Sequence, residues 1–369
     1  MTPPSRASWR PKVLRLGIIE SAFDAWKQVE EIAEIVVPES TNREDFIKEC
    51  RSGAFDGATI AYRTFDSVKI TGRIDSEFID ALPASLIFIC HNGTFSIRAL
   101  GQSLTDIASG AGYDQIDIAA CSNRAFLEDK PPIRVSNTPT AVDDATADIG
   151  IWLMLGALRN LNSSITSLRK GEWRGKRLPA LGHDPQGKVL GILGMGGIGR
   201  NMARKARVFG MKIQYHNRKP IAPELEAECE ARYVNFDELL KTSDVISLNL
   251  PLNDNTRHII STPQFEIMKK GVVVVNTARG AVIDENALVA ALDKGHVASA
   301  GLDVYENEPQ VHEGLLANPN VLIVPHMGTW TEETQTKMEE WTISNVVSAI
   351  KQGELRSIVP EQKIPVAGP

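Results

Sequence analysis

The sequence predicts an α/β protein made of two doubly wound units, each built on a parallel sheet. Three observations point to this fold class. From Lys188 onward, short apolar runs alternate with stretches of helical periodicity. A glycine-rich turn follows the first of these runs, and an apolar, helix-prone stretch at 143–160 separates them from an earlier α/β segment. Alternation of this kind is typical of strands joined by crossover helices, which makes the sheet parallel.

The elements of the second half can be placed in order. Residues 189–193 are strand-like, residues 198–209 have helical spacing of apolar side chains, and residues 211–215 are strand-like again, which predicts a βαβ unit. Further strands are expected at 244–250, 272–276, 297–304 and 321–324. A helix over 284–294 should end at Gly295, because glycine commonly follows the last helical residue.

The first 140 residues indicate a separate α/β unit. Its strands are expected at 13–19, 57–61, 86–90 and 134–136. We interpret the helical stretches at 143–160 and 332–351 as helices that cross between the two units. The chain then starts in one domain, builds the second and returns, giving domains at 1–142 plus 333–369 and at 143–332. A cleft between such domains is the expected ligand site.

Composition and charge favour a small-molecule partner. The 369 residues are 43% hydrophobic and carry 40 Lys+Arg against 46 Asp+Glu, a net charge of −6. No long basic run is present, so neither nucleic acid nor a membrane surface is an expected partner. The longest apolar run, 149–158, is too short to span a membrane, and the N-terminus lacks a signal-peptide pattern, so we expect a cytoplasmic protein. The four cysteines form no Cys-x-x-Cys pair, which predicts buried thiols and no metal site.

A dinucleotide-binding motif lies between a predicted strand and a predicted helix. It consists of Gly194, Met195, Gly196, Gly197, Ile198 and Gly199. In this context the first glycine allows the tight turn, the second admits a pyrophosphate, and the third lets the helix pack on the strand. The helix N-terminus adds backbone N–H donors for the phosphates. The motif predicts a Rossmann-like NAD(P)-binding domain, with a purely structural turn as the alternative.

The residues after the next strand concern the choice of dinucleotide. An enzyme that uses NAD usually has an Asp or Glu there to accept hydrogen bonds from the adenosine ribose. This chain has Asn217, Arg218 and Lys219 instead. Two cations without a carboxylate favour a 2′-phosphate, so we expect NADP(H) to be preferred, with NAD(H) as the second choice. The competing interpretation is that the two cations only solvate a loop.

Three segments that follow predicted strands contain the remaining candidate catalytic side chains. They are Asn276–Gly280, Gly301–Pro309 and Pro325–Gly328. Because the carboxyl ends of parallel strands face the ligand crevice, Arg279, Glu308 and His326 are expected to converge there. Singly, each side chain has a structural interpretation, as an ion-pair partner, a solvated acid or a core histidine. Together, beside a cofactor motif, they favour a catalytic site.

The order of these segments resembles the D-isomer-specific 2-hydroxyacid dehydrogenase family, close to its glyoxylate and hydroxypyruvate reductases. The resemblance covers nearly the whole chain and rests on the glycine motif, Asn-Thr-Ala-Arg-Gly, Asp-Val-Tyr-x-x-Glu-Pro and Pro-His-x-Gly. It implies a flavodoxin-like substrate domain, an NAD(P)-binding domain, and reduction of a small 2-oxo acid to the D-2-hydroxy acid. Glyoxylate or hydroxypyruvate is the expected substrate, and an aromatic or branched 2-oxo acid is the alternative. It also implies that Arg279, Glu308 and His326 are catalytic.

The same resemblance implies which residues contact cofactor and substrate. Asp303 is expected to hold the nicotinamide carboxamide. The other residues expected along the cofactor trough are Leu250, Pro251, Thr256, Thr277, Ala278, Arg279, His326 and Gly328. Those expected to contact the substrate are Ala111, Gly112, Arg279 and Trp330. Ordinary strand-end packing is the alternative for the trough, and a core position is the alternative for Trp330.

The residue types suit reduction of a 2-oxo acid, which needs a hydride at the carbonyl carbon and a proton at its oxygen. His326 is the expected proton donor, because histidine holds and releases a proton near neutral pH. A carboxylate from Glu308 would favour the protonated ring and fix its orientation. Arg279 would bind the substrate carboxylate and polarise the carbonyl through paired hydrogen bonds.

The chain departs from the family pattern in one place. After His91, Asn92 and Gly93, residues 94–110 interrupt a loop that would otherwise continue as Ala-Gly-Tyr-Asp. A genuine insertion and a retained intron both remain open as its origin. Because the interruption directly precedes Ala111, it either displaces the carboxylate-binding loop and disables turnover, or extends harmlessly into solvent.

A homodimer is the implied assembly. Residues 171–187, rich in glycine, proline and charge, resemble the dimer arm of the family. Trp152 is expected to pack within the apolar helix, and the alternative that the resemblance implies is that this region reaches a partner subunit. A dinucleotide-sensing binding protein that acts through partners is the alternative function. The sequence shows neither a partner groove nor a regulatory tail, which favours the enzyme.

Overall fold

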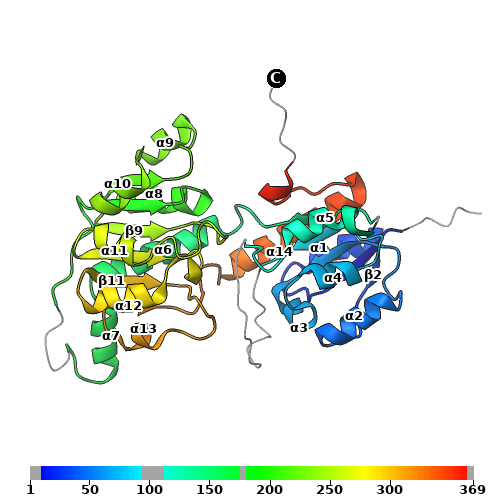
Figure 1. Cartoon of the computed structure of the whole chain (residues 1–369), viewed down its shortest axis with the longest axis horizontal. Helices are drawn as coiled ribbons and strands as arrows, with labels where there is room; N and C mark the ends of the chain where they lie inside the picture. Colours follow the sequence, from blue (N-terminus) through cyan, green and yellow to red (C-terminus); the bar gives the residue numbers. More distant parts are fainter. Residues whose placement is uncertain (1–9, 94–111, 129, 175–179, 364–369) are drawn as a thin grey trace, which may run out of the picture. The chain divides into compact units, whose positions relative to one another are not determined.

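The structure is a computed structural model that describes residues 10–93, 112–128, 130–174 and 180–363 (Figure 1). The described chain divides into two compact units. Unit 1 contains the described residues up to Ala141 and those from Thr331 onward, and unit 2 runs from Val142 to Trp330. The chain therefore leaves unit 1, builds unit 2 and returns.

Unit 1 is built on a five-stranded parallel sheet with the order β2-β1-β3-β4-β5. Its strands are β1 (Lys12–Arg15), β2 (Glu34–Val36), β3 (Ala58–Arg63), β4 (Phe88–His91) and β5 (Arg134–Ser136). This is the flavodoxin-like order of a doubly wound sheet. All five strands run parallel, so their carboxyl ends lie along one edge of the sheet.

Helices cover both faces of this sheet (Figure 1). They are α1 (Phe23–Ile32), α2 (Arg43–Arg51), α3 (Val68–Thr71), α4 (Ser76–Ala81), α5 (Ile118–Glu128) and α14 (Glu332–Gln352). Successive strand residues alternate between two cores: Val13 packs with α1 and α14, whereas Leu14 packs with α2, α4 and α5. The period of two follows from the pleat of the strand.

Unit 2 is built on a seven-stranded parallel sheet with the order β8-β7-β6-β9-β10-β11-β12. Its strands are β6 (Val189–Leu193), β7 (Lys212–His216), β8 (Ala231–Tyr233), β9 (Val245–Leu248), β10 (Val272–Asn276), β11 (Val297–Leu302) and β12 (Val321–Ile323). Strands β6 and β9 pair with each other in the middle of the sheet. The strands that follow β6 in the chain extend the sheet on one side, and those that follow β9 extend it on the other. Such a switch point is where doubly wound sheets bind ligands.

Helices also cover both faces of the second sheet. They are α6 (Asp143–Leu158), α7 (Leu161–Arg169), α8 (Gly197–Val208), α9 (Pro223–Cys229), α10 (Phe236–Thr242), α11 (Thr262–Ile267), α12 (Glu285–Asp293) and α13 (Glu313–Ala317). Helices α6 and α8 share one core with the strands, and α10, α11 and α12 share the other. Helix α12 begins at Asp284, whose carboxylate accepts from Ala287 N, and Gly295 follows its end with a φ of 65°.

The structure confirms the predicted fold class and nearly all of the predicted strands. It corrects the sequence reading at two short edge strands, β2 and β8, which were not expected because three-residue strands leave little periodic signal. Each supposed crossing helix lies within one unit, α6 in unit 2 and α14 in unit 1. The expectation that Trp152 packs within its helix is wrong, because this residue is 43% exposed. No helix in the described part of the chain is long and apolar enough to cross a membrane.

Candidate active site

The predicted site residues of unit 2 leave the sheet from one edge. In the register of the strands, Leu193 pairs with both His216 and Leu248. Asn276 pairs with Leu248 on one side and Leu302 on the other, and Leu302 pairs with Ile323. The loops that follow these residues therefore begin at the same level. This alignment brings together the glycine turn, Asn217, Leu250, Arg279, Asp303 and His326.

The glycine turn connects β6 to α8, and its first and last glycines, Gly194 and Gly199, leave no room for a side chain. Gly194 has a φ of 102°, and a Cβ there would lie 2.6 Å from the carbonyl oxygen of Asn249. A Cβ on Gly199 would lie 2.3 Å from the carbonyl oxygen of Gly194, so the third glycine lets the helix approach the turn. Gly196 is the N-cap of α8, provides no side-chain cap, and faces open space. The turn thus has the shape and the N–H donors that a pyrophosphate requires.

Asn217, at the end of β7, is tied to the glycine turn. Its Oδ1 accepts a hydrogen bond from Met195 N at 2.7 Å, and its carbonyl accepts one from the Tyr233 hydroxyl at 3.2 Å. Arg218 and Lys219 are exposed, and neither forms an ion pair with another described residue. Two cations without an ion pair in the described chain therefore follow an uncharged residue at this end of the sheet.

The residues of the predicted trough hold the shape of their own loops. The Thr256 hydroxyl donates to the Pro251 carbonyl at 2.7 Å and accepts from Asn253 N at 2.8 Å, while Leu250 is half-buried beside them. Thr277 and Ala278 are buried directly after β10. The structure therefore places all of them at the same edge of the sheet.

Arg279 lies in a turn that Asn276 organises. The Asn276 side chain accepts from Ala278 N at 3.0 Å and donates to the Arg279 carbonyl at 2.9 Å. Gly280 follows, where a Cβ would lie 1.8 Å from the Tyr305 carbonyl carbon, so the turn is pressed against the neighbouring loop. We did not single out Asn276 as a site residue. An asparagine at the start of a turn is a sequence signal that could have found it.

His326 and Glu308 form a nearly buried pair. The Nδ1 of His326 donates to Oε2 of Glu308 at 2.8 Å, and each side chain is 10% exposed. The other carboxylate oxygen of Glu308 accepts from Tyr305 N at 2.8 Å. A carboxylate acceptor at Nδ1 fixes the proton on that nitrogen, so Nε2 is the ring atom that can exchange a proton with a ligand.

Asp303 holds the turn that carries His326. The carboxylate accepts from the backbone N–H groups of Met327 and Gly328, the second at 2.9 Å, and the Asp303 carbonyl accepts from His326 N at 2.8 Å. These bonds stabilise His326 at a φ of 56°, a left-handed conformation that is costly for a residue with a side chain. Burial raises the pKa of Asp303 to about 6, partly offset by His326 and by the two N–H donors.

The predicted substrate contacts are distributed over both units. Trp330 is the last residue of unit 2 and half-buried, and its backbone N–H donates to the Met327 carbonyl at 3.0 Å. Gly112 belongs to unit 1, where its carbonyl oxygen lies 3.2 Å from Nε2 of His91. Ala111 and the interrupting residues 94–110 lie outside the described residues.

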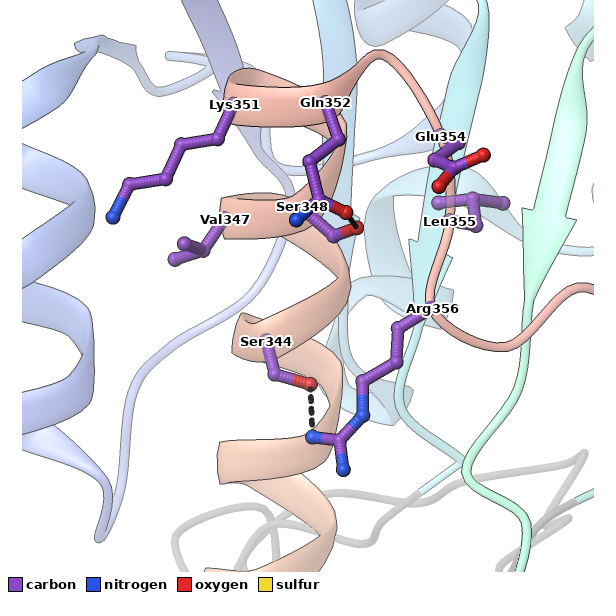
Figure 2. Close-up of a pocket in the computed structure, with 8 residues that line it drawn as sticks. All are labelled: Ser344, Val347, Ser348, Lys351, Gln352, Glu354, Leu355 and Arg356. Atoms are coloured by element: carbon purple, nitrogen blue, oxygen red, sulfur yellow. Dashed lines mark hydrogen bonds between the residues drawn. The ribbon is translucent and has the colours of Figure 1, made fainter.

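A hollow of about 400 Å³ occurs in unit 1 at the end of α14, and none of the predicted site residues that the structure describes lines it (Figure 2). Its lining residues are Ser344, Val347, Ser348, Lys351, Gln352, Glu354, Leu355 and Arg356. The Arg356 guanidinium lies 4.2 Å from the centre of the Trp341 ring and donates to the Ser344 hydroxyl. Because none of the described predicted site residues lines it, this hollow is not a candidate active site.

The fold and this set of strand-end residues define a dinucleotide-dependent oxidoreductase. The NAD binding domain of D-isomer specific 2-hydroxyacid dehydrogenases matches residues 151–328. The chain is also 52% identical over 353 residues to 4-methyl-2-oxopentanoate reductase A of Aspergillus oryzae, covering 96% of this chain and 99% of that protein. The chain belongs to the D-isomer specific 2-hydroxyacid dehydrogenase family.

Solved structures agree with this assignment. A glyoxylate reductase from Paecilomyes thermophila is 51% identical with a TM-score of 0.86, over 96% of this chain and 99% of that one. An NADPH-dependent glyoxylate/hydroxypyruvate reductase from Sinorhizobium meliloti, solved with NADP and malonate, is 27% identical with a TM-score of 0.76, over 96% and 98% of the two chains. This chain is thus an enzyme that uses a nicotinamide dinucleotide and acts on small 2-oxo or 2-hydroxy acids.

Proposed function

We propose that the protein reduces a small 2-oxo acid of the glyoxylate or hydroxypyruvate type to the D-2-hydroxy acid, with NADPH as the preferred cofactor. The observation that carries this proposal is the His326–Glu308 pair at the carboxyl edge of a sheet that also carries the glycine turn. When bound, the dinucleotide supplies the hydride for the carbonyl carbon. The chain's own residues bind the acid and supply the proton.

In this mechanism Arg279 binds the substrate carboxylate and polarises the neighbouring carbonyl. The Nε2 of His326 gives its proton to the carbonyl oxygen as the C=O bond is reduced to an alcohol. Glu308 stays ionised and stabilises the protonated ring before the transfer, through the 2.8 Å bond to Nδ1. The ring regains a proton from solvent before the next turnover. Asp303 keeps the His326 turn in place, as its backbone hydrogen bonds support.

The preference for NADPH is supported by the charges after β7. Asn217 has no carboxylate to repel a 2′-phosphate, and Arg218 and Lys219 are exposed beside it. We expect Arg218→Ala to weaken NADPH binding about tenfold and to change NADH binding less than twofold, measured by nucleotide fluorescence titration. Arg232→Ala is the matched control, because Arg232 is also exposed and instead pairs with Glu238 at 2.8 Å. Equal losses for NADPH and NADH would contradict the preference.

The substrate assignment is tested by following NADPH oxidation with glyoxylate, hydroxypyruvate, 4-methyl-2-oxopentanoate and phenylpyruvate. We expect the highest kcat/KM with one of the first two acids. A parallel variant that lacks residues 94–110 tests whether the interruption disables turnover. If only the shortened protein is active while both bind NADPH, the full chain is a cofactor-binding isoform without turnover.

We further propose a homodimer. Apolar side chains of α7 and the segment after it are strongly exposed, with Leu168 at 56%, Trp173 at 72% and Leu181 at 94%. Trp152 on α6 adds a further exposed ring. Exposed apolar side chains of this number favour burial against a second copy. Light scattering after size exclusion should give twice the mass of one chain, and a monomer at micromolar concentration would contradict the proposal.

A further inference from the structure

Unit 1 contains two fully buried arginines with different surroundings. Arg124 donates to the carbonyl oxygens of Leu82, Pro83 and Leu86 at 2.6–3.0 Å. These bonds give hydrogen-bond donors to the carbonyl groups of the loop between α4 and β4. Arg63 is the last residue of β3 and is 0% exposed. Within the described chain no carboxylate pairs with it, and its Nε atom has no hydrogen-bond partner. A buried cation without a counter-ion is costly, so its retention requires an explanation.

The hydrogen bonds of Arg63 fix the protonation of His91. The guanidinium Nη1 lies 3.0 Å from Nδ1 of His91, and Arg63 pairs directly with His91 in the register of β3 and β4. A guanidinium can only donate, so Nδ1 of His91 must accept and the ring must be neutral with its proton on Nε2. That Nε2 then donates to the Gly112 carbonyl at 3.2 Å. His91 itself is 4% exposed.

The result is a directed chain of hydrogen bonds from Arg63 through His91 to Gly112. A second donor of the same guanidinium, Nη2, reaches Oε1 of Gln115 at 3.4 Å. Arg63 thus contacts both the end of β4 and the segment that begins at Gly112, the two sides of the interrupted loop. These hydrogen bonds connect Gly112 and Gln115 to the ends of β3 and β4.

We infer that Arg63 and His91 are positioning residues that hold Gly112 in place for the substrate carboxylate. The inference rests on the proposed function, in which Gly112 contacts the 2-oxo acid. The uncompensated positive charge of Arg63 also favours an anion at this end of the sheet. Burial lowers the pKa of Arg63 to about 10, which still leaves the guanidinium charged at neutral pH.

The test separates substrate binding from catalysis and from folding. His91→Leu removes both hydrogen bonds, and we expect the KM for the 2-oxo acid to rise at least tenfold with kcat at saturation and NADPH affinity within twofold of the wild type. His91→Gln retains an acceptor for Arg63 and a donor for Gly112, so its KM should stay within threefold. Arg63→Met should raise KM as His91→Leu does. Arg124→Met is the matched control, because it removes an equally buried arginine and should lower the Tm without changing KM.

Three results would overturn the inference. The first is an unchanged KM in folded His91→Leu and Arg63→Met. The second is an equal rise of KM in His91→Gln, and the third is an equal rise in Arg124→Met. If the wild type reduces no 2-oxo acid, the proposed function fails, and the arrangement is tested by ¹⁵N NMR of the histidine rings. A proton on Nδ1 of His91 would then contradict the hydrogen-bond chain.

Discussion

Replacing Glu308 by Gln changes the charge beside His326 and little else. The carboxylate holds two donors, Tyr305 N and His326 Nδ1, each at 2.8 Å. In Glu308→Gln the amide oxygen can still accept from Tyr305 N, which turns the amide NH₂ toward Nδ1. The ring must then accept at Nδ1, and it becomes a neutral imidazole, a far weaker proton donor than the imidazolium.

The magnitude follows from the bond that is lost. A hydrogen bond to a charged group contributes about 1.5–3 kcal/mol, and the two side chains are only 10% exposed, so solvent screens the interaction little. At about 1.4 kcal/mol per tenfold change in rate, kcat should fall by about 10- to 150-fold. The assay is NADPH oxidation at saturating 2-oxo acid and pH 7, with the NADPH Kd and the Tm measured on the same preparation.

Glu306→Gln is the matched control, because it removes a carboxylate on the same loop. Glu306 pairs with His258 at 2.6 Å and with Arg257 at 3.6 Å, and neither of these ion pairs involves His326. We expect its kcat to remain within threefold of the wild type. A folded Glu308→Gln enzyme with a kcat within threefold of the wild type would refute the proposed role of the pair, as would an equal loss in both variants.

Three further outcomes are expected. Asn217→Asp keeps the oxygen that accepts from Met195 N but adds a negative charge, so the ratio of NADPH to NADH affinity should fall at least tenfold in fluorescence titrations. The Glu339 carboxylate accepts hydrogen bonds from three backbone N–H groups at the start of α1, at 2.7–3.0 Å. Glu339→Gln removes its charge and should lower the free energy of unfolding, measured by urea titration, by about 2–4 kcal/mol. Because the pKa of Asp303 is raised from 3.8 to about 6, its contribution to stability is complete below pH 3.8 and is lost as the pH rises to 6. Asp303→Asn should remove that part of the pH dependence when the free energy of unfolding is measured by urea titration at several pH values. An unchanged slope of this free energy against pH would show that Asp303 titrates normally.

Patterns local in sequence were sufficient to predict much of the fold. Strands β6 and β10 were predicted with their observed limits, because both are apolar runs ended by turn residues. The glycine turn was equally readable, since a tight turn, a close phosphate and a close helix each require a residue without a side chain. The types of residue at the carboxyl ends of the strands also followed from the motifs, and with them the dehydrogenase family.

Contacts between distant residues could not be read in this way. Nothing local indicates that Glu339 supplies the acceptor for the N-terminus of α1, 317 residues away, or that Asp303 holds the turn of His326. The same holds for Arg63 and His91, whose pairing depends on the register of β3 against β4.

The sequence by itself determined the class of fold, the cofactor motif and the side chains available for chemistry, because these depend on periodicity and on residue type. Only the tertiary structure decided which atoms meet: Nδ1 of His326 with Oε2 of Glu308, and Nδ1 of His91 with the Arg63 guanidinium. The physical reason is that a hydrogen bond depends on distance and direction within a fraction of an ångström. Strand order and loop packing set those distances, and residue spacing along the chain does not.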